Sequence, residues 1–217
     1  MTGWTWLRWH SLLGAVPLAG YLLLHLLGQV LALRGNALQR GFQALLERSV
    51  LLSALEIGLI YLPLCAHAGL GLWRVARSEP GSAGATERDS PWPLGWGRSL
   101  QRLSAFVLLL FLVFHVWQLD GRLWLGELRR PDLLPELCAS LSSTAFGGIP
   151  FVALGYLLGV AAAAVHAAQG LYDACSSWGW VSPAQRERLG RACLVGGIAL
   201  FAVGALIIVQ LATGSVS

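Results

Sequence analysis

Four of the five histidines in this 217-residue chain fall inside long apolar stretches, one in each of four stretches. They are His25, His67, His115 and His166. Imidazole is the commonest metal ligand in proteins, and an ionisable residue in an apolar segment usually faces a partner. A single histidine in such a place is often only a donor bonded to a neighbouring helix. Four on four separate stretches indicate a shared chemistry.

The stretches that carry these histidines are predicted transmembrane helices. The sequence is 56% hydrophobic and 12% charged, whereas a soluble domain has about 25% charged residues. Its apolar residues form five continuous blocks, each close to the ~20 residues with which a helix crosses a bilayer. Continuous blocks favour helices over strands, because an unpaired backbone is not tolerated in lipid. We therefore expect an all-α integral membrane bundle in a single domain, 1–217, with spans at about 12–33, 50–73, 103–119, 150–172 and 192–211.

The charged residues lie mostly between the blocks and indicate how the chain is oriented. All fifteen basic residues are arginines, and the formal net charge is +4. With the N-terminus inside, nine arginines fall on the inner side and six on the outer side, which favours a cytoplasmic N-terminus. No nucleic-acid-binding signature accompanies this charge. Two short surface helices are predicted in the loop after the third span, around 122–129 and 132–141.

The depth of each histidine predicts how the four are paired. His25 and His115 each lie thirteen residues from the inner end of their span, about 20 Å along a helix, while His67 and His166 lie seven residues, about 10 Å, from it. These depths predict the pairs His25 with His115 and His67 with His166. A zinc site would require all four ligands at one depth. Two imidazoles from facing helices can instead hold a porphyrin, which predicts two b-type haems, held without the C-x-x-C-H motif of covalent attachment.

Residues near the histidines suggest how a haem would be accommodated. The segments 67–73 and 166–172 share the pattern H-x-x-x-G-L-aromatic, which places Gly71 and Gly170 on the same helical face as the histidine. A glycine there would let a flat ring approach the backbone, although ordinary helix packing also explains it. The remaining histidine, His10, has no partner at its depth and is not counted as an axial ligand.

Polar residues at the two ends of the spans are further candidates. A haem propionate requires hydrogen bonds or a cation at the inner ends, where Ser11, Gln101 and Arg102 lie; Arg102 also fits a positive-inside anchor. Glu56 lies within the outer half of the second span. An intramembrane carboxylate is a functional candidate, here for proton exchange with a quinone. The alternative for Glu56 is a structural bond to a neighbouring helix.

These features together resemble a known family, the five-helix, diheme cytochrome b membrane anchor of succinate:menaquinone oxidoreductase, related to the diheme anchor of fumarate reductase. The resemblance runs in order through every helix except the fifth. The matching positions are 7–14, Pro17, His25, 54–57, 62–64, 67–68, 100–102, 115–117, His166, 170–171, 178–179 and Pro183.

The resemblance implies that His67 and His166 bind a proximal haem b, near an iron–sulfur subunit, and that His25 and His115 bind a distal haem b. It implies a quinone-reactive subunit of the bacterial inner membrane, which passes electrons through both haems to menaquinone. Succinate itself would be oxidised in a flavoprotein partner that works with the iron–sulfur partner. One position departs from the diheme fumarate reductase anchors: their glutamate two residues before the counterpart of His166 is Ala164 here, which puts a proton path through that carboxylate in doubt.

Two other functions fit parts of the sequence. A diheme cytochrome b can serve another dehydrogenase, such as one for formate, nitrate or hydrogen. A transporter could use its histidines to relay protons, although the predicted helices show no matching interruptions in two halves, and the number of spans is odd.

Overall fold

The computed structural model describes residues 3–32, 54–77 and 96–214. Within these ranges, five helices are long and apolar enough to cross a membrane: Arg8–Leu31, Ala54–Ala76, Ser99–Trp124, Phe151–Ser177 and Pro183–Thr213. The predicted all-α bundle of five spans is confirmed. The outer ends of the first two predicted spans and most of the loop after the second lie outside the described residues. The described ranges contain no strand, only one isolated bridge between Ala145 and Ile149.

The third and fifth spans extend beyond their predicted ends. The third consists of α6 (Trp96–Val116), the π-helical turn η4 (Trp117–Gly121) and α7 (Arg122–Trp124), whereas hydropathy predicts only 103–119. The fifth consists of the short 3-10 turn η6 (Pro183–Gln185) and α10 (Arg186–Thr213). Hydropathy locates the apolar part of a helix, and arginines such as Arg102 end that part without ending the helix, because their long stems reach water from a helical backbone.

Prolines coincide with wide turns in the first two spans. The first span runs through α1 (Gly3–Leu13), the π-helical turn η1 (Gly14–Leu18) and α2 (Ala19–Ala32). The second runs from Ala54 through the π-helical turn η2 (Ile57–Tyr61) to α5 (Leu62–Ala76). Pro17 lies inside η1, and Pro63 is the second residue after η2. Proline lacks an N–H and collides with the carbonyl four residues earlier, which a wider turn accommodates.

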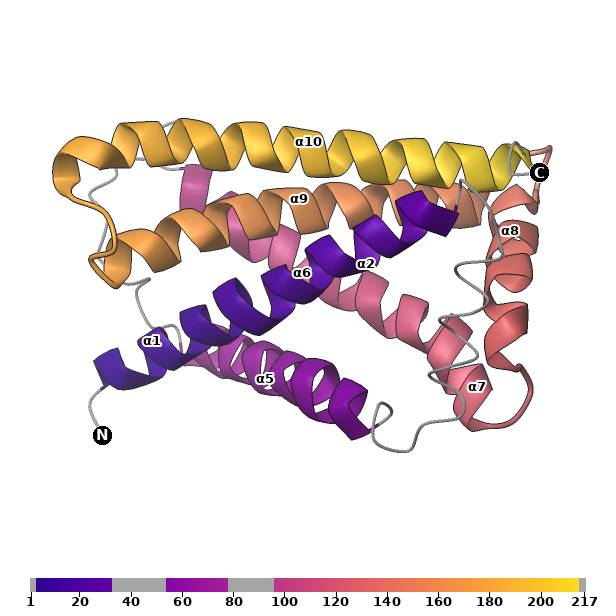
Figure 1. Ribbon diagram of the computed structural model, residues 1–217, viewed down its shortest axis with the longest axis horizontal. Coiled ribbons are helices and arrows are strands. Elements are labelled where there is room, and N and C mark those ends of the chain that lie inside the picture. The colour runs from indigo at the N-terminus through magenta and orange to yellow at the C-terminus, as the bar shows by residue number, and fades with distance from the viewer. Residues whose placement is uncertain (1–2, 33–53, 78–95, 215–217) are drawn as a thin grey trace.

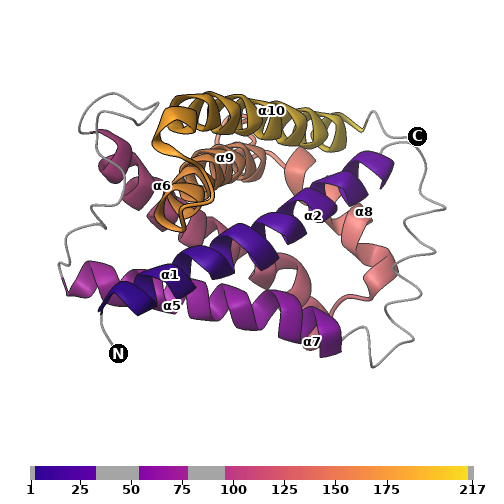
Figure 2. The ribbon, with the colours of Figure 1, turned by 60° about the vertical axis from the view of Figure 1, so that its left-hand side comes forward.

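The helices form two groups. α9 (Phe151–Ser177) and α10 are antiparallel and closely packed, with α6 against α9, while α1 packs along α5 on the other side (Figures 1 and 2). Glycines allow the close contact of α9 with α10: a Cβ at position 204 would lie 2.5 Å from Cγ1 of Val160. α9 also packs against α1 and η1, so the fourth span contacts both groups.

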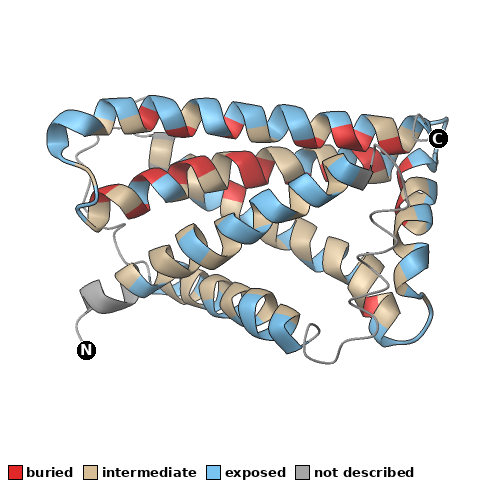
Figure 3. Ribbon diagram, in the orientation of Figure 1, coloured by how far each residue is buried: buried red, intermediate tan, exposed pale blue. Residues whose placement is uncertain are grey.

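Burial is concentrated in one of these groups. In the most apolar stretch of the α9 span, 33% of the residues are buried, whereas 0% are buried in the corresponding stretches of the first two spans. Figure 3 shows the buried residues along α9 and on the side of α10 that faces it. The spans that carry His25 and His67 are therefore covered only in part by side chains of this chain.

A short helix lies across the end of the bundle at which α9 begins and α10 ends. α8 (Leu133–Ser142) stands roughly perpendicular to α9 and α10 in Figure 1 and follows the 3-10 turn η5 (Arg130–Asp132). This confirms the surface helix predicted at 132–141, whereas the one predicted at 122–129 is helical only over α7. An apolar cluster joins α8 to the two long helices: Leu137, Leu141, Ala153, Tyr156, Ile207, Ile208 and Leu211.

Candidate haem-binding site

The four intramembrane histidines lie together in two pairs. The ring centres of His25 on α2 and His115 on α6 are 6.1 Å apart, with the ring planes at 82°. Those of His67 on α5 and His166 on α9 are also 6.1 Å apart, at 81°. These are the two pairs that the depth argument predicts, and each pair joins helices from different parts of the sequence. Their role as iron ligands remains a prediction.

The spacing within each pair fits two ligands on one metal. An imidazole nitrogen binds a metal at about 2 Å, so two imidazoles on opposite sides of one metal have ring centres roughly 6 Å apart. The described residues contain no group of three or more histidine, cysteine or acidic side chains placed to hold a metal ion. The two histidine pairs are the kind of donor set that two separate haems would use, one pair for each.

The second ring nitrogen of His67 has a partner that fixes its hydrogen. Nδ1 of His67 lies 2.9 Å from the backbone carbonyl oxygen of His10. A carbonyl only accepts, so Nδ1 must donate and the neutral ring leaves Nε2 bare. Ligating histidines usually donate their other ring N–H in this way, so the residues present fit a metal-bound imidazole.

The other three histidines differ in this second contact. Nδ1 of His115 lies 3.0 Å from the hydroxyl of Tyr156, and Nδ1 of His25 lies 3.4 Å from the exposed hydroxyl of Tyr21. Nδ1 of His166 is buried and makes no well-formed hydrogen bond to the described residues. The backbone of Gln101 nevertheless lies close enough to interact with the imidazole.

His10 lies beside the inner pair. Its ring is stacked on that of His67, with centres 4.1 Å apart and planes at 14°. Gly71 lies under this stack, since a Cβ there would be 3.3 Å from Nε2 of His10. Gly14 is a contact that the sequence analysis missed: a Cβ at this position would lie 2.8 Å from Cε1 of His67. In the same way, a Cβ at Gly170 would lie 3.5 Å from Nε2 of Gln101.

The predicted propionate residues are placed unequally. Ser11 Oγ donates to the carbonyl of Arg8 at 3.0 Å and accepts from Nε1 of Trp178 at 3.2 Å. Gln101 is partly buried near His166, and its Oε1 has no hydrogen-bond partner among the described residues. Arg102 is exposed, and no bond joins it to the described site residues.

Two other arginines lie at the end of the bundle that carries His67 and His166, and the sequence did not identify either as a propionate candidate. Arg74 lies close enough to interact electrostatically with His10 and His67. The guanidinium of Arg8 lies 4.9 Å from the ring centre of Trp178. Arg74 follows His67 by seven residues, which is two helical turns on the same face, and this spacing is the signal that would have identified it.

Glu56 lies at the other end of the bundle in an ion pair. Its Oε2 is 3.0 Å from a guanidinium nitrogen of Arg130, and the side chains of Glu56 and Arg130 are 25% and 13% exposed. Arg130, in η5, is therefore a partner for the alternative interpretation of Glu56 as a structural residue. Glu56 is also not the only acid within a span, because the third span continues past Asp120, whose side chain bonds to that of Tyr61.

The sequence of this chain is similar over most of its length to that of a known protein. No family model and no solved structure matches the chain. The chain is 29% identical over 182 residues to the succinate dehydrogenase cytochrome b558 subunit of Bacillus subtilis (strain 168). The aligned residues cover 84% of this chain and 83% of that protein. This similarity over most of the chain, together with the five apolar helices, confirms the resemblance to the five-helix cytochrome b anchors of succinate dehydrogenase.

Proposed function

We propose that this chain is the membrane-anchor and cytochrome b subunit of a succinate dehydrogenase that reduces menaquinone. The observation that carries the proposal is the two histidine pairs, each 6.1 Å between ring centres, in a chain similar to a cytochrome b558 subunit of succinate dehydrogenase. Its partners would be the flavoprotein and iron–sulfur subunits, bound at the cytoplasmic face of the bacterial inner membrane. The chain then crosses that membrane five times with its N-terminus inside.

The proposed cofactors are two haems b, one at each pair. His67 and His166 would hold the proximal haem and His25 and His115 the distal one, and these groups would supply one-electron chemistry between the iron–sulfur subunit and menaquinone. The chain contributes the orientation of four imidazoles from four helices. At His67 it also fixes the hydrogen on Nδ1 through the carbonyl of His10.

The inner end of the bundle supplies the groups that a propionate requires. Arg74 brings positive charge close to the inner pair, and Ser11 and Gln101 bring hydrogen-bonding groups to the same end. Charge-assisted bonds to carboxylates are the strongest of these interactions. We assign Arg74, in place of the exposed Arg102, as the main cation there.

The outer end supplies acid–base groups for a quinone. Glu56, Arg130, Tyr61 and Asp120 lie together where the second and third spans meet η5. Quinone reduction consumes protons as well as electrons, so a carboxylate that exchanges protons must lie near the quinone. We propose that Glu56 has this role for menaquinone, with Arg130 holding its carboxylate in place.

Haem stoichiometry tests the proposal directly. The purified complex should contain two non-covalent, six-coordinate haems b per copy of this chain, measured by pyridine haemochrome against protein. Acid acetone should extract all of the haem b, because the sequence has no C-x-x-C-H motif. One haem per chain, or none, would reject the assignment. A complex that reduces quinone with formate or hydrogen but not with succinate would keep the haems and reject the partner.

A further inference from the structure

Two aromatic side chains, Phe111 and Tyr156, lie against the ring of His115. Phe111 stacks on it, with ring centres 5.5 Å apart and planes at 19°. Tyr156 meets it edge to face at 5.5 Å and places its hydroxyl 3.0 Å from Nδ1. Tyr156 is itself only 5% exposed, so the contact with His115 lies among buried side chains.

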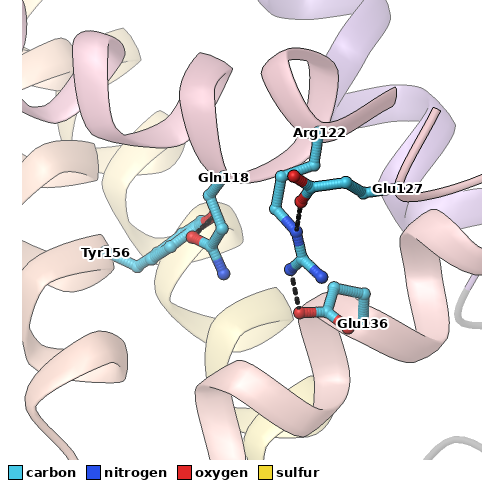
Figure 4. A network of polar contacts seen from close by, with 5 residues as sticks. All are labelled: Gln118, Arg122, Glu127, Glu136 and Tyr156. Carbon is cyan, nitrogen blue, oxygen red and sulfur yellow. Dashed lines mark hydrogen bonds and ion pairs between the residues drawn. The ribbon is translucent and has the colours of Figure 1, made fainter. Parts of the chain in front are cut away.

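The hydroxyl of Tyr156 has a second partner that sets the direction of the bond to His115. It donates to Oε1 of Gln118 at 3.0 Å, and Figure 4 shows the amide of Gln118 beside the end of the tyrosine ring. A phenol has one hydrogen. Because that hydrogen goes to Gln118, the oxygen must accept from His115, so Nδ1 carries the hydrogen and Nε2 is bare.

The opposite arrangement would conflict with metal binding. If the amide of Gln118 donated to the tyrosine oxygen, the phenol hydrogen would point at Nδ1 and the ring hydrogen would move to Nε2. That nitrogen could not then bind a metal. With the hydrogen bonds running from His115 to Tyr156 and from Tyr156 to Gln118, Nε2 of His115 is left free to bind a metal.

The packing around Tyr156 keeps its hydroxyl in this position. The ring belongs to the apolar cluster that α8 and α10 form with α9, beside Leu137, Leu141 and Ile208. Gly159 lies almost one turn further along α9, and a Cβ there would collide with the ring of Phe111. Gly159 thus admits Phe111 against His115, and the cluster fixes Tyr156 from the other side.

On these grounds, and resting on the proposed haem binding, we propose that Tyr156 with Gln118 is a positioning pair that sets the redox potential of the His25/His115 haem. A hydrogen bond accepted from Nδ1–H makes imidazole a more basic ligand, which favours the oxidised iron. His67 donates to a backbone carbonyl, which no substitution removes, and the contact of His25 is long and exposed. Tyr156 is therefore the side chain whose removal should change the potential of the His25/His115 haem.

Redox titration of the intact complex with Tyr156→Phe tests this proposal. The variant should keep two haems per chain, and the potential of the haem that His25→Ala affects should rise. We expect roughly a tenfold change in its oxidised-to-reduced ratio, about 59 mV for one electron. Gln118→Leu should raise the same potential by less, because the free hydroxyl still accepts from Nδ1. The other haem should keep its potential in both variants.

Tyr172→Phe is the matched control. It removes the hydroxyl of another buried tyrosine on α9, about 24 Å further along the helix, and should leave the potential of the His25/His115 haem unchanged. If Tyr156→Phe keeps both haems with unchanged potentials, or shifts both equally, the proposal is overturned while the haem assignment stands. If Tyr156→Phe loses the haem, Gln118→Leu decides: it retains the packed ring, and an unchanged potential would reject the positioning role.

Discussion

The five histidines of this chain differ in the role that we propose for them, because each ring has different neighbours. His67 has its Nδ1 bonded to a carbonyl and a second imidazole 6.1 Å away. The ring of His10 is stacked face to face on the ring of His67, with the ring centres 4.1 Å apart. A ligand must point a nitrogen at the metal rather than stack on another ligand. The arrangement therefore fits the axial role that we propose for His67 and a supporting role for His10.

Single substitutions of the histidines should separate the two pairs. Loss of one axial imidazole should remove or convert one haem and leave the other spectrally intact. His25→Ala should therefore resemble His115→Ala in the reduced-minus-oxidised spectrum, and His67→Ala should resemble His166→Ala. His10→Ala is the control and should keep both haems low-spin. The pairing is wrong if His25→Ala removes the same spectral component as His67→Ala.

The pairs of histidines could be predicted from the sequence, but the contacts that support them could not. Depth along a helix follows from residue number, so the pairing of His25 with His115 needs only the span ends and the reversal of the chain. The contact of Tyr156 with His115 depends on how α9 is rotated against α6. The π-helical turn η4 also decides where Gln118 points, and hydropathy contains neither quantity.

At the scale of elements, the contact between α9 and α10 explains the residue at position 164. Ala164 is 4% exposed, and a Cβ at Gly197 would lie 3.2 Å from its carbonyl oxygen. Helices that approach so closely need small residues at the contact. The departure from the glutamate of the diheme fumarate reductase anchors thus coincides with tight backbone packing, which leaves little room for a carboxylate.

Two neighbouring glycines of α10 allow this contact to be tested. Gly197→Leu should destabilise the solubilised protein by about 1–3 kcal/mol, the usual cost of overpacking, because a Cβ there already lies 3.0 Å from that of Ala168. Gly196→Leu is the matched control, since nothing lies within 4 Å of a Cβ at that position. Thermal unfolding in detergent, followed by loss of the haem spectrum, compares the two. Equal midpoints for both variants would contradict the close contact of α9 with α10.

The ends of the elements were harder to predict than their existence. Five blocks of apolar residues were enough to find five spans, because lipid leaves no other way to satisfy the backbone. The helical continuation of the third span to Trp124 was missed, and with it the placement of Asp120 inside that span. Pro17 and Pro63 marked the positions where the first two spans are irregular, although the sequence does not specify a π turn.

Across the whole molecule, the two ends of the bundle differ in chemistry. The end that carries His67 and His166 places Arg74 close to both His67 and Asp173, and Arg8 lies on Trp178 at the same end. The outer end gathers acids and a phenol near the pair of His25 and His115, with Glu56 held by Arg130. Cations suit propionates and a docking partner, and acid–base groups suit a quinone that takes up protons. The direction of electron transfer that we propose, from inside to outside, follows from this asymmetry.

This asymmetry predicts that turnover depends on the membrane potential. In the orientation that we propose, electrons from succinate enter inside. If menaquinone takes its protons from outside, charge then crosses the membrane without compensation. Moving one charge across costs or gains about 2.3 kcal/mol per 100 mV. With Ala164 packed against α10, the described helices offer no carboxylate at that position to carry protons in parallel. The complex in proteoliposomes, with a water-soluble menaquinone analogue, should therefore change its rate of succinate oxidation when a potassium gradient and ionophore impose a potential.

The sign of the effect and one substitution make this test decisive. A potential that is negative inside should speed outward electron transfer, and the opposite potential should slow it by a similar factor. Glu56→Gln should lower quinone reduction while both haems remain bound and reducible by succinate, because only the proton-exchanging group is changed. Arg130→Gln, which leaves the carboxylate but removes its partner at 3.0 Å, should have a smaller effect. Turnover that ignores the imposed potential, with Glu56→Gln fully active, would reject both the outer quinone site and the role of Glu56.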